Sequence, residues 1–466
     1  MMMRSKNLIL FILLLNFSLA GCKKGNGQPK EPPVTKPPVA NDDPAQYGSP
    51  FNNVPNTEDV VMYEVNLRAF SAAGTFKGVQ ERLDSIKNLG VNVIWLMPIH
   101  PMGALKGIGS PYAVKNYMEV AAEYGTLDDL RSLVDEAHAR NIAVLMDWVA
   151  NHTAWDNPWI QNKAWYTQDG SGNIISPAGM GWNDVADLNY NNADMRTAMI
   201  KAMKYWVLTA NVDGFRCDYA NGAPQTFWKA AIDTLRKIPN RKLMMLAEGD
   251  RKDHFSAGFN LSFGFNFFGI LEDVYNSNSP AAALVASNSS EYNAVPAGSH
   301  VLRYTSNHDN NIYDGTPIDL FKGERGSMGA FVLASYMGGV PLIYTAQEIG
   351  YTSKIPFFTK STVNWNSGNP AMTAEYKKLI AFRKSSAAVK SGTIAYYTNS
   401  PDVVAFKRTS GSEQVVVLVN VRGTEVTYAL DPSLSGTSWT NVLTSGSVSF
   451  STNIKLSPYS YLILRK

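Results

Sequence analysis

The chain has 466 residues, with 42 Lys and Arg against 39 Asp and Glu and a net charge of +3 at pH 7. No basic cluster is interleaved with aromatic residues, so nucleic acid is not expected as a partner. The two cysteines, Cys22 and Cys217, exclude a CxxC redox or metal site, and the length allows one large domain and a small one.

The first 21 residues have the pattern of an export signal. A short basic start precedes the apolar stretch LILFILLLNFSLA, which is too short for a comfortable membrane-spanning helix. The following LAGC, residues 19–22, resembles the bacterial lipobox. That resemblance implies cleavage before Cys22, a lipid on Cys22, and anchoring in the cell envelope, facing the periplasm or the outside. The alternative is an ordinary signal peptide with an incidental cysteine.

Residues 22–52 have the composition of a linker. They are rich in Pro, Lys and Gly and contain almost no large apolar residues, so they cannot bury a core of their own. We expect a disordered tether between the lipid anchor and a folded body.

From residue 60 the chain alternates between short apolar runs and segments of helical periodicity. In chain order, strands are predicted at 60–67, 91–98, 142–149, 212–218, 242–248, 261–269, 301–309 and 340–348, and helices at 76–90, 126–141, 193–211, 223–238 and 325–339. The strands are apolar on both faces, which suits a parallel sheet covered by helices. This predicts an α/β fold, a closed (β/α)₈ TIM barrel over residues 53–388 with a short inserted region at 153–183.

The pattern changes near residue 391. Residues 393–430 alternate between apolar and polar side chains with a period of two and are interrupted by turn residues. We therefore expect residues 389–466 to form a C-terminal antiparallel β-sandwich domain.

Polar residues follow the predicted strands at the ends where such barrels carry their chemistry. They are Asp147, Asn151, His152, Arg216, Asp218, Glu248, Asn307, His308 and Asp309. Arg216 and Asp218 are two apart on one strand, so they project from the same face. Taken alone, this pair is as well explained by a structural ion pair as by an ionised nucleophile. So many charges at one rim favour a functional network.

Six segments resemble motifs of the α-amylase superfamily of glycoside hydrolases, in the right order. DWVANH (147–152), GFRCD (214–218), AEG (247–249) and SNHD (306–309) look like its four short motifs. VADLNYNN (185–192) looks like a fifth, and GVPLIYTAQE (339–348) resembles the eighth-strand segment.

The resemblance implies a role for each site residue. Asp218 would be the nucleophile, Glu248 the general acid and base, and Asp309 the residue that stabilises the transition state. The implied substrate-binding residues are Tyr112, Asp147, His152, Arg216 and His308. Such a site needs no cofactor and divides the work between an ionised and a protonated carboxyl.

Calcium is possible, because Asn151 and Asp187 match positions that can hold it in the family. Two side chains fall short of the six to eight oxygens that calcium takes. The family often has Lys-His where this chain has Asn221 and Gly222. The inserted region carries Trp155, Trp159, Trp165 and Trp182, most of which we expect to pack the loop, with one or two lining the sugar groove.

The implied function is a retaining, endo-acting hydrolase that cleaves α-1,4-glucosidic bonds in starch or malto-oligosaccharides. Alternatives with the same site are a neopullulanase-like or cyclodextrin-degrading enzyme, a debranching enzyme, and an α-glucan transglycosylase. From another class, a non-catalytic glucan-binding lipoprotein is the remaining alternative. Loss of a catalytic carboxylate would favour it, but all three are present.

Overall fold

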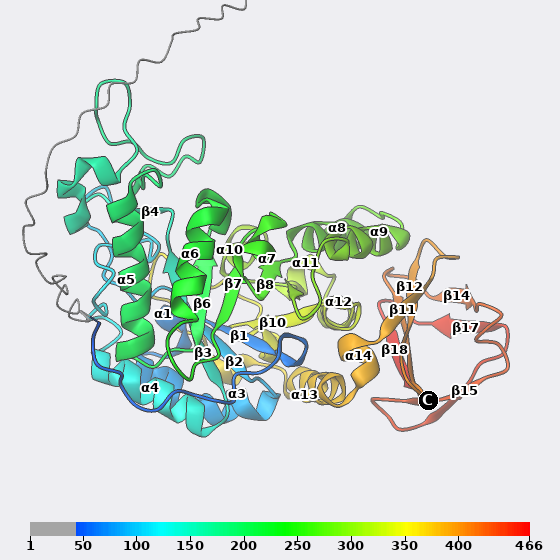
Figure 1. Ribbon diagram of the computed structural model, residues 1–466. Coiled ribbons are helices and arrows are strands. Elements are labelled where there is room, and N and C mark those ends of the chain that lie inside the picture. The colour runs from blue at the N-terminus through cyan, green and yellow to red at the C-terminus, as the bar shows by residue number, and fades with distance from the viewer. Residues whose placement is uncertain (1–42) are drawn as a thin grey trace, which may run out of the picture. The chain divides into compact units, whose positions relative to one another are not determined.

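A barrel of eight parallel strands forms the centre of the computed structural model, which describes residues 43–466 (Figure 1). Around the barrel the order is β1-β10-β9-β8-β7-β6-β3-β2. The strands are β1 (Met62–Val65), β2 (Val93–Leu96), β3 (Ala143–Val149), β6 (Gly214–Asp218), β7 (Met244–Ala247), β8 (Leu261–Phe263), β9 (His300–Arg303) and β10 (Val340–Tyr344). Almost all of their residues are buried, as parallel strands between two apolar layers must be. The predicted TIM barrel is confirmed, including its sixth strand within 261–269.

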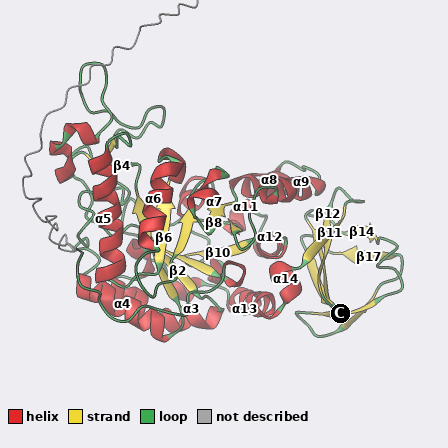
Figure 2. Ribbon diagram, in the orientation of Figure 1, coloured by secondary structure: helices red, strands yellow, loops and turns green. Residues whose placement is uncertain are grey.

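Helices surround the barrel (Figure 2). They are α1 (Leu67–Phe70), α2 (Phe76–Gln80), α3 (Leu83–Leu89), α4 (Leu127–Ala139), α5 (Ala193–Thr209), α6 (Gln225–Leu235), α7 (Asp253–Ala257), α8 (Phe265–Asn276), α9 (Ala282–Tyr292), α10 (His308–Tyr313), α11 (Pro317–Leu320), α12 (Glu324–Tyr336), α13 (Pro370–Ser385) and α14 (Ala387–Ser391). Within residues 43–466, none of them combines the length and apolarity needed to cross a membrane.

Local capping residues set several helix ends. Thr126 accepts a hydrogen bond from the backbone N–H of Asp129, whose side chain accepts one in return, so a capping box begins α4. Gly90 ends α3 with a left-handed φ of 101°, which glycine adopts at little cost. The helix predicted over 76–90 is wrong in one respect. It divides into α2 and α3, because Arg82 takes a non-helical backbone conformation between them.

The inserted region after β3 begins and ends in a small antiparallel pair. Strands β4 (His152–Ala154) and β5 (Val185–Asp187) pair with each other, with His152 opposite Asp187. The pair holds both ends of the loop beside the C-terminal end of β3. It therefore places His152 at the rim of the barrel.

The C-terminal domain contains two sheets. A six-stranded sheet has the order β11-β12-β13-β18-β15-β16, and β14 and β17 form a second sheet. The strands are β11 (Thr393–Tyr397), β12 (Val403–Ser410), β13 (Glu413–Asn420), β14 (Val426–Ala429), β15 (Ser438–Asn441), β16 (Ser447–Ser449), β17 (Asn453–Leu456) and β18 (Tyr461–Arg465). On β13, Val415, Val417 and Val419 join the barrel core, while Val416 and Leu418 join a separate core with residues of β14 and β17. The period of two in the sequence thus separates these two cores.

The segment at residues 43–52 lies against the barrel. The ring of Phe51 stacks on His138 with centroids 4.2 Å apart. The backbone N–H of Tyr47 donates to the carbonyl of Leu208 over 2.7 Å, and the side chain of Asn211 donates to the carbonyl of Ser49. The prediction of a tether over 22–52 is therefore corrected for residues 43–52, because Phe51 and the backbone find partners on the barrel. The predicted signal peptide, Cys22 and the rest of the tether lie outside the described residues.

Candidate active site

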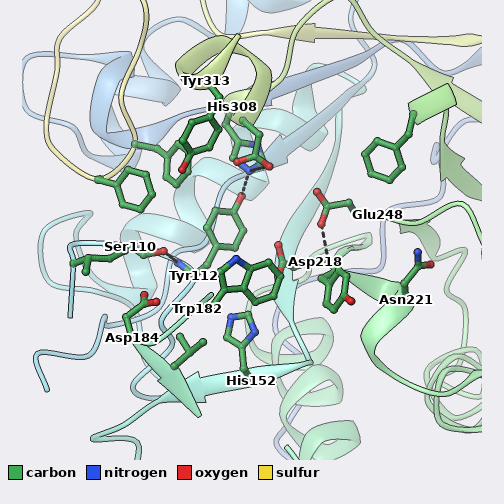
Figure 3. Close-up of a pocket in the computed structure, with 17 residues that line it drawn as sticks. Ser110, Tyr112, His152, Trp182, Asp184, Asp218, Asn221, Glu248, His308 and Tyr313 are labelled. Carbon is green, nitrogen blue, oxygen red and sulfur yellow. Dashed lines mark hydrogen bonds and ion pairs between the residues drawn. The ribbon is translucent and has the colours of Figure 1, made fainter. Parts of the chain in front are cut away.

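A cleft of about 560 Å³ opens at the C-terminal ends of the strands (Figure 3). Six of the residues implied by the motifs line it together: Tyr112, His152, Asp218, Glu248, His308 and Asp309. They come from β6, the segment after β7, the start of α10 and the loops after β2 and β3. Parallel strands bring these distant positions together because all their C-terminal ends meet at one rim.

Arg216 lies beneath the cleft and contacts three carboxylates. Its Nη1 is 2.7 Å from Oδ1 of Asp147 and 3.0 Å from Oδ1 of Asp218, and its Nη2 is 2.5 Å from Oε1 of Glu248. Arg216 and Asp147 are almost fully buried. From this position they support the carboxylates below the cleft, and their expected contact with substrate stays a prediction.

The charge balance around Arg216 controls the protonation of Asp218. Burial raises the pKa of Asp218 well above its ordinary value, the nearby carboxylate of Glu248 raises it further, and Arg216 opposes the rise. One guanidinium faces three carboxylates, so it cannot neutralise all of them. Asp218 therefore retains a proton more readily than an isolated Asp carboxyl would.

The backbone of Tyr219 orients Glu248. Tyr219 has a left-handed conformation with a φ of 37°, which is unfavourable for a side chain of this size. In this conformation its N–H donates to Oε2 of Glu248 over 2.7 Å. Between Tyr219 and Arg216, both oxygens of the Glu248 carboxylate have a partner.

His308, the first residue of α10, is hydrogen-bonded on both ring nitrogens. Its Nδ1 is 2.6 Å from Oε1 of Glu64, and its Nε2 is 2.8 Å from the hydroxyl of Tyr112. That hydroxyl in turn donates to Oδ2 of Asp147, as does Nε1 of Trp95. Sequence reasoning missed Glu64, although a lone acid within the apolar run VVMYEVNL was a signal for it.

His152 borders the opposite part of the cleft. Burial lowers its pKa to about 4, so the ring is neutral near pH 7 and has one N–H to donate. Trp182 and His152 pack in an edge-to-face arrangement with ring centroids 5.5 Å apart, and Figure 3 shows the two side chains next to each other.

The other tryptophans of the inserted region have packing roles. Trp159 packs on Tyr117 and on the edge of Trp165, and Nε1 of Trp155 donates to the carbonyl of Asn183. Trp182 alone of the four lines the cleft, which confirms the expected division. Sequence reasoning missed the other aromatic lining residues because none of them is part of a motif: Tyr219, Phe265, Tyr313, Phe357 and Phe358.

Asn151 and Asp187 do not form a complete calcium site by themselves. The Nδ2 of Asn151 is 3.3 Å from Nδ1 of His152, and its Oδ1 lies close above Gly222, where a Cβ would be only 2.0 Å away. Burial raises the pKa of Asp187. Across residues 43–466, no three His, Cys, Asp or Glu side chains are grouped to hold a metal ion. The side-chain donors therefore fall short of the oxygen shell that calcium takes.

The chain matches two family models. "Alpha amylase, catalytic domain" matches residues 46–172 and 179–375, and "Alpha-amylase SusG C-terminal domain" matches residues 403–463. The first covers most of the barrel, including every cleft carboxylate, and the second covers most of the C-terminal domain.

Individual relatives agree with these matches. Alpha-amylase MalA of Haloarcula japonica is 26% identical over 83% of this chain, which spans only 59% of that protein's length. Alpha-amylase 2 of Dictyoglomus thermophilum is 25% identical over 88% of this chain and 73% of its own length. The crystal structure of the noncanonic maltogenic alpha-amylase AmyB of Thermotoga neapolitana has a TM-score of 0.80 at 26% identity, covering 88% of this chain and 99% of that one. Because the catalytic-domain model matches more than half of the chain, the chain belongs to the α-amylase family of glycoside hydrolases.

Proposed function

We propose that this protein is a retaining hydrolase that cleaves internal α-1,4 bonds of starch or malto-oligosaccharides. The observation that carries the proposal is the arrangement of Asp218 and Glu248, which face one cleft and bind neighbouring nitrogens of Arg216. A shared guanidinium holds the two carboxyls close together, as a retaining mechanism needs. The relatives named as α-amylases, and one named as maltogenic, support an α-glucan as the substrate.

In the first step, an oxygen of the Asp218 carboxylate attacks the anomeric carbon and forms a covalent glycosyl ester. Glu248 gives its proton to the departing glycosidic oxygen, so the bond to that oxygen breaks as the ester forms. This step requires one proton on the pair of carboxyls at working pH. We place it on Glu248 in the productive complex, because Asp218 must attack as the anion.

In the second step, Glu248 removes a proton from water, the water oxygen attacks the same carbon, and Asp218 leaves as a carboxylate. Asp309 faces the cleft with its side chain 46% exposed, so it is free to bind sugar hydroxyls. His308 lies beside it, with Nε2 3.5 Å from Oδ2 of Asp309. Asp309 would stabilise the positive charge of the transition state, and His308 would donate a hydrogen bond to a sugar hydroxyl.

The configuration of the first product tests the mechanism. Proton NMR during the first minutes of maltopentaose hydrolysis should detect α-anomeric reducing ends before mutarotation. β-Anomers would exclude retention, and a single released sugar from chain ends of amylose would exclude endo cleavage. Assays of product release from pullulan and from cyclodextrin distinguish the α-1,4 hydrolase from a neopullulanase-like, a debranching or a cyclodextrin-degrading enzyme.

We also propose that the chain is a lipoprotein of the bacterial cell envelope, on the basis of its LAGC segment. Expression with a clickable fatty acid should label the protein in a bacterial host, and Cys22→Ala should abolish the label. Equal labelling of both forms would contradict an anchor at Cys22.

A further inference from the structure

Glu64 is a carboxylate within the barrel core that the mechanism above does not use. It lies in the middle of β1, and its side chain is fully buried. A buried carboxylate is costly unless it is paired and hydrogen-bonded. Among the described residues its Oε2 has no hydrogen-bond partner, so the interaction made by Oε1 has to offset the cost of burying the carboxylate.

The partner of Oε1 is Nδ1 of His308, at 2.6 Å. The pair joins β1 to the start of α10, which are 244 residues apart in sequence. A hydrogen bond at Nδ1 fixes the orientation of an imidazole ring and decides which ring nitrogens carry protons. Here it directs Nε2 toward the cleft, where the ring also stacks on Tyr112 with centroids 5.3 Å apart.

The contacts continue from His308 to the catalytic carboxylates. Nε2 lies 2.8 Å from the Tyr112 hydroxyl, the link drawn as a dashed line in Figure 3. The hydroxyl donates to Oδ2 of Asp147, and Arg216 binds Oδ1 of the same carboxylate. If Nε2 donates to Tyr112, every hydrogen bond in this series from Glu64 to Arg216 has one donor and one acceptor. Burial raises the pKa of Glu64 and His308 opposes the rise; with Glu64 ionised, that direction requires a proton on both nitrogens of His308.

We propose that Glu64 is a positioning residue for the reaction: its carboxylate holds His308 as an imidazolium whose Nε2–H points at Tyr112 and the cleft. The proposal rests on the proposed function, in which His308 and Tyr112 face the sugar. It explains why an apolar strand keeps an acid at this position.

The charges around His308 agree with this protonation state. Burial by itself lowers the pKa of His308, but Asp309 on α10 and Glu64 on β1 outweigh it and raise the pKa to about 9. Arg216 on β6 opposes them. Removing the charge of Glu64 should therefore lower the pKa, so that the ring loses its proton at a lower pH.

The test is Glu64→Gln, which keeps the shape of the side chain and removes the charge. Histidine-selective NMR suits a chain with 6 histidines, and the resonances missing in His308→Gln identify His308. We expect the pKa of His308 to fall from about 9 to about 7 or lower. We expect kcat/KM on maltopentaose to fall roughly ten- to a hundredfold, with the alkaline limb of its pH profile moved to lower pH.

A double-mutant cycle shows whether Glu64 acts through His308. On the His308→Gln background, Glu64→Gln should cost less than about threefold in kcat/KM. The matched control is Asp213→Asn, which alters a second buried pair, with His138 at 2.7 Å, away from the cleft. It should lower the melting temperature and leave kcat/KM per folded molecule within about twofold.

Three results would overturn the inference: an unchanged pKa of His308 in Glu64→Gln, a lowered pKa with kcat/KM within twofold of wild type, or additive losses in the cycle. If Glu64→Gln does not fold, Glu64→Asp serves instead, because its shorter side chain moves the carboxylate away from His308 by one methylene. An unchanged pKa of His308 in Glu64→Asp would also overturn the inference. The NMR titration does not depend on activity. An inactive wild-type protein would therefore contradict the proposed function, while the NMR titration would still show whether Glu64 sets the pKa of His308.

Discussion

Asp218→Asn should lower kcat on maltopentaose by several orders of magnitude, on the order of 10³–10⁵. The amide has nearly the same shape, but it cannot form a glycosyl ester by attack as an anion. The fold should survive, because the amide oxygen still accepts the hydrogen bond that Nη1 of Arg216 now donates over 3.0 Å. Initial rates and thermal melts of the same preparation measure both effects.

The same substitution should keep or raise the melting temperature at pH 7. The pKa of Asp218 is raised in the folded protein, so its ionisation destabilises the fold as pH rises above the ordinary range of an Asp carboxyl. A neutral amide removes that penalty. The control is Asp128→Asn on the surface of α4, where the ion pair with Arg131 is exposed, and it should change neither quantity. Near-normal turnover in Asp218→Asn would exclude this residue as the nucleophile.

Arg216→Ala should impair both turnover and stability. It leaves the carboxylates of Asp147, Asp218 and Glu248 without their shared cation. Removal of one partner from a buried ion pair costs about 3–5 kcal/mol of stability. Loss of the opposing positive charge raises the pKa of Asp218 further. Since the proposed mechanism needs an ionised Asp218, the acid limb of the pH–rate profile should move to higher pH.

The informative comparison is with Arg303→Ala. Arg303 is also buried and pairs with Glu291 at 2.8 Å, but Glu291 lies on α9, away from the cleft. Both variants should melt at lower temperature, and only Arg216→Ala should lose turnover per folded molecule, measured well below its melting temperature. If Arg216→Ala behaved like Arg303→Ala, Arg216 and Asp218 would be a structural ion pair.

The order of the elements and the residues at the rim could be predicted from the sequence. Apolar side chains on both faces of a strand and helical periodicity are local patterns, so each segment could be assigned from its own residues. A barrel of parallel strands then brings every strand end to one rim, which is why Asp218, Glu248 and Asp309 could be placed in one site before any contact was known. The break of the predicted helix at Arg82 was not visible, because a two-residue interruption leaves the apolar spacing almost unchanged.

Which charges face each other, and how far water is excluded from them, depends on the packing of the barrel and could not be predicted from the sequence. Glu64 and His308 are far apart in the chain and meet because the barrel closes between β1 and β10, beside β9. The sequence indicated Arg216 as the partner of one aspartate, but in the structure its guanidinium forms ion pairs with three carboxylates from three strand ends. Phe51 lies in a segment with the composition of a linker, yet it stacks on His138 of α4. Such pairings depend on register and desolvation, which are properties of the packed barrel rather than of any one segment.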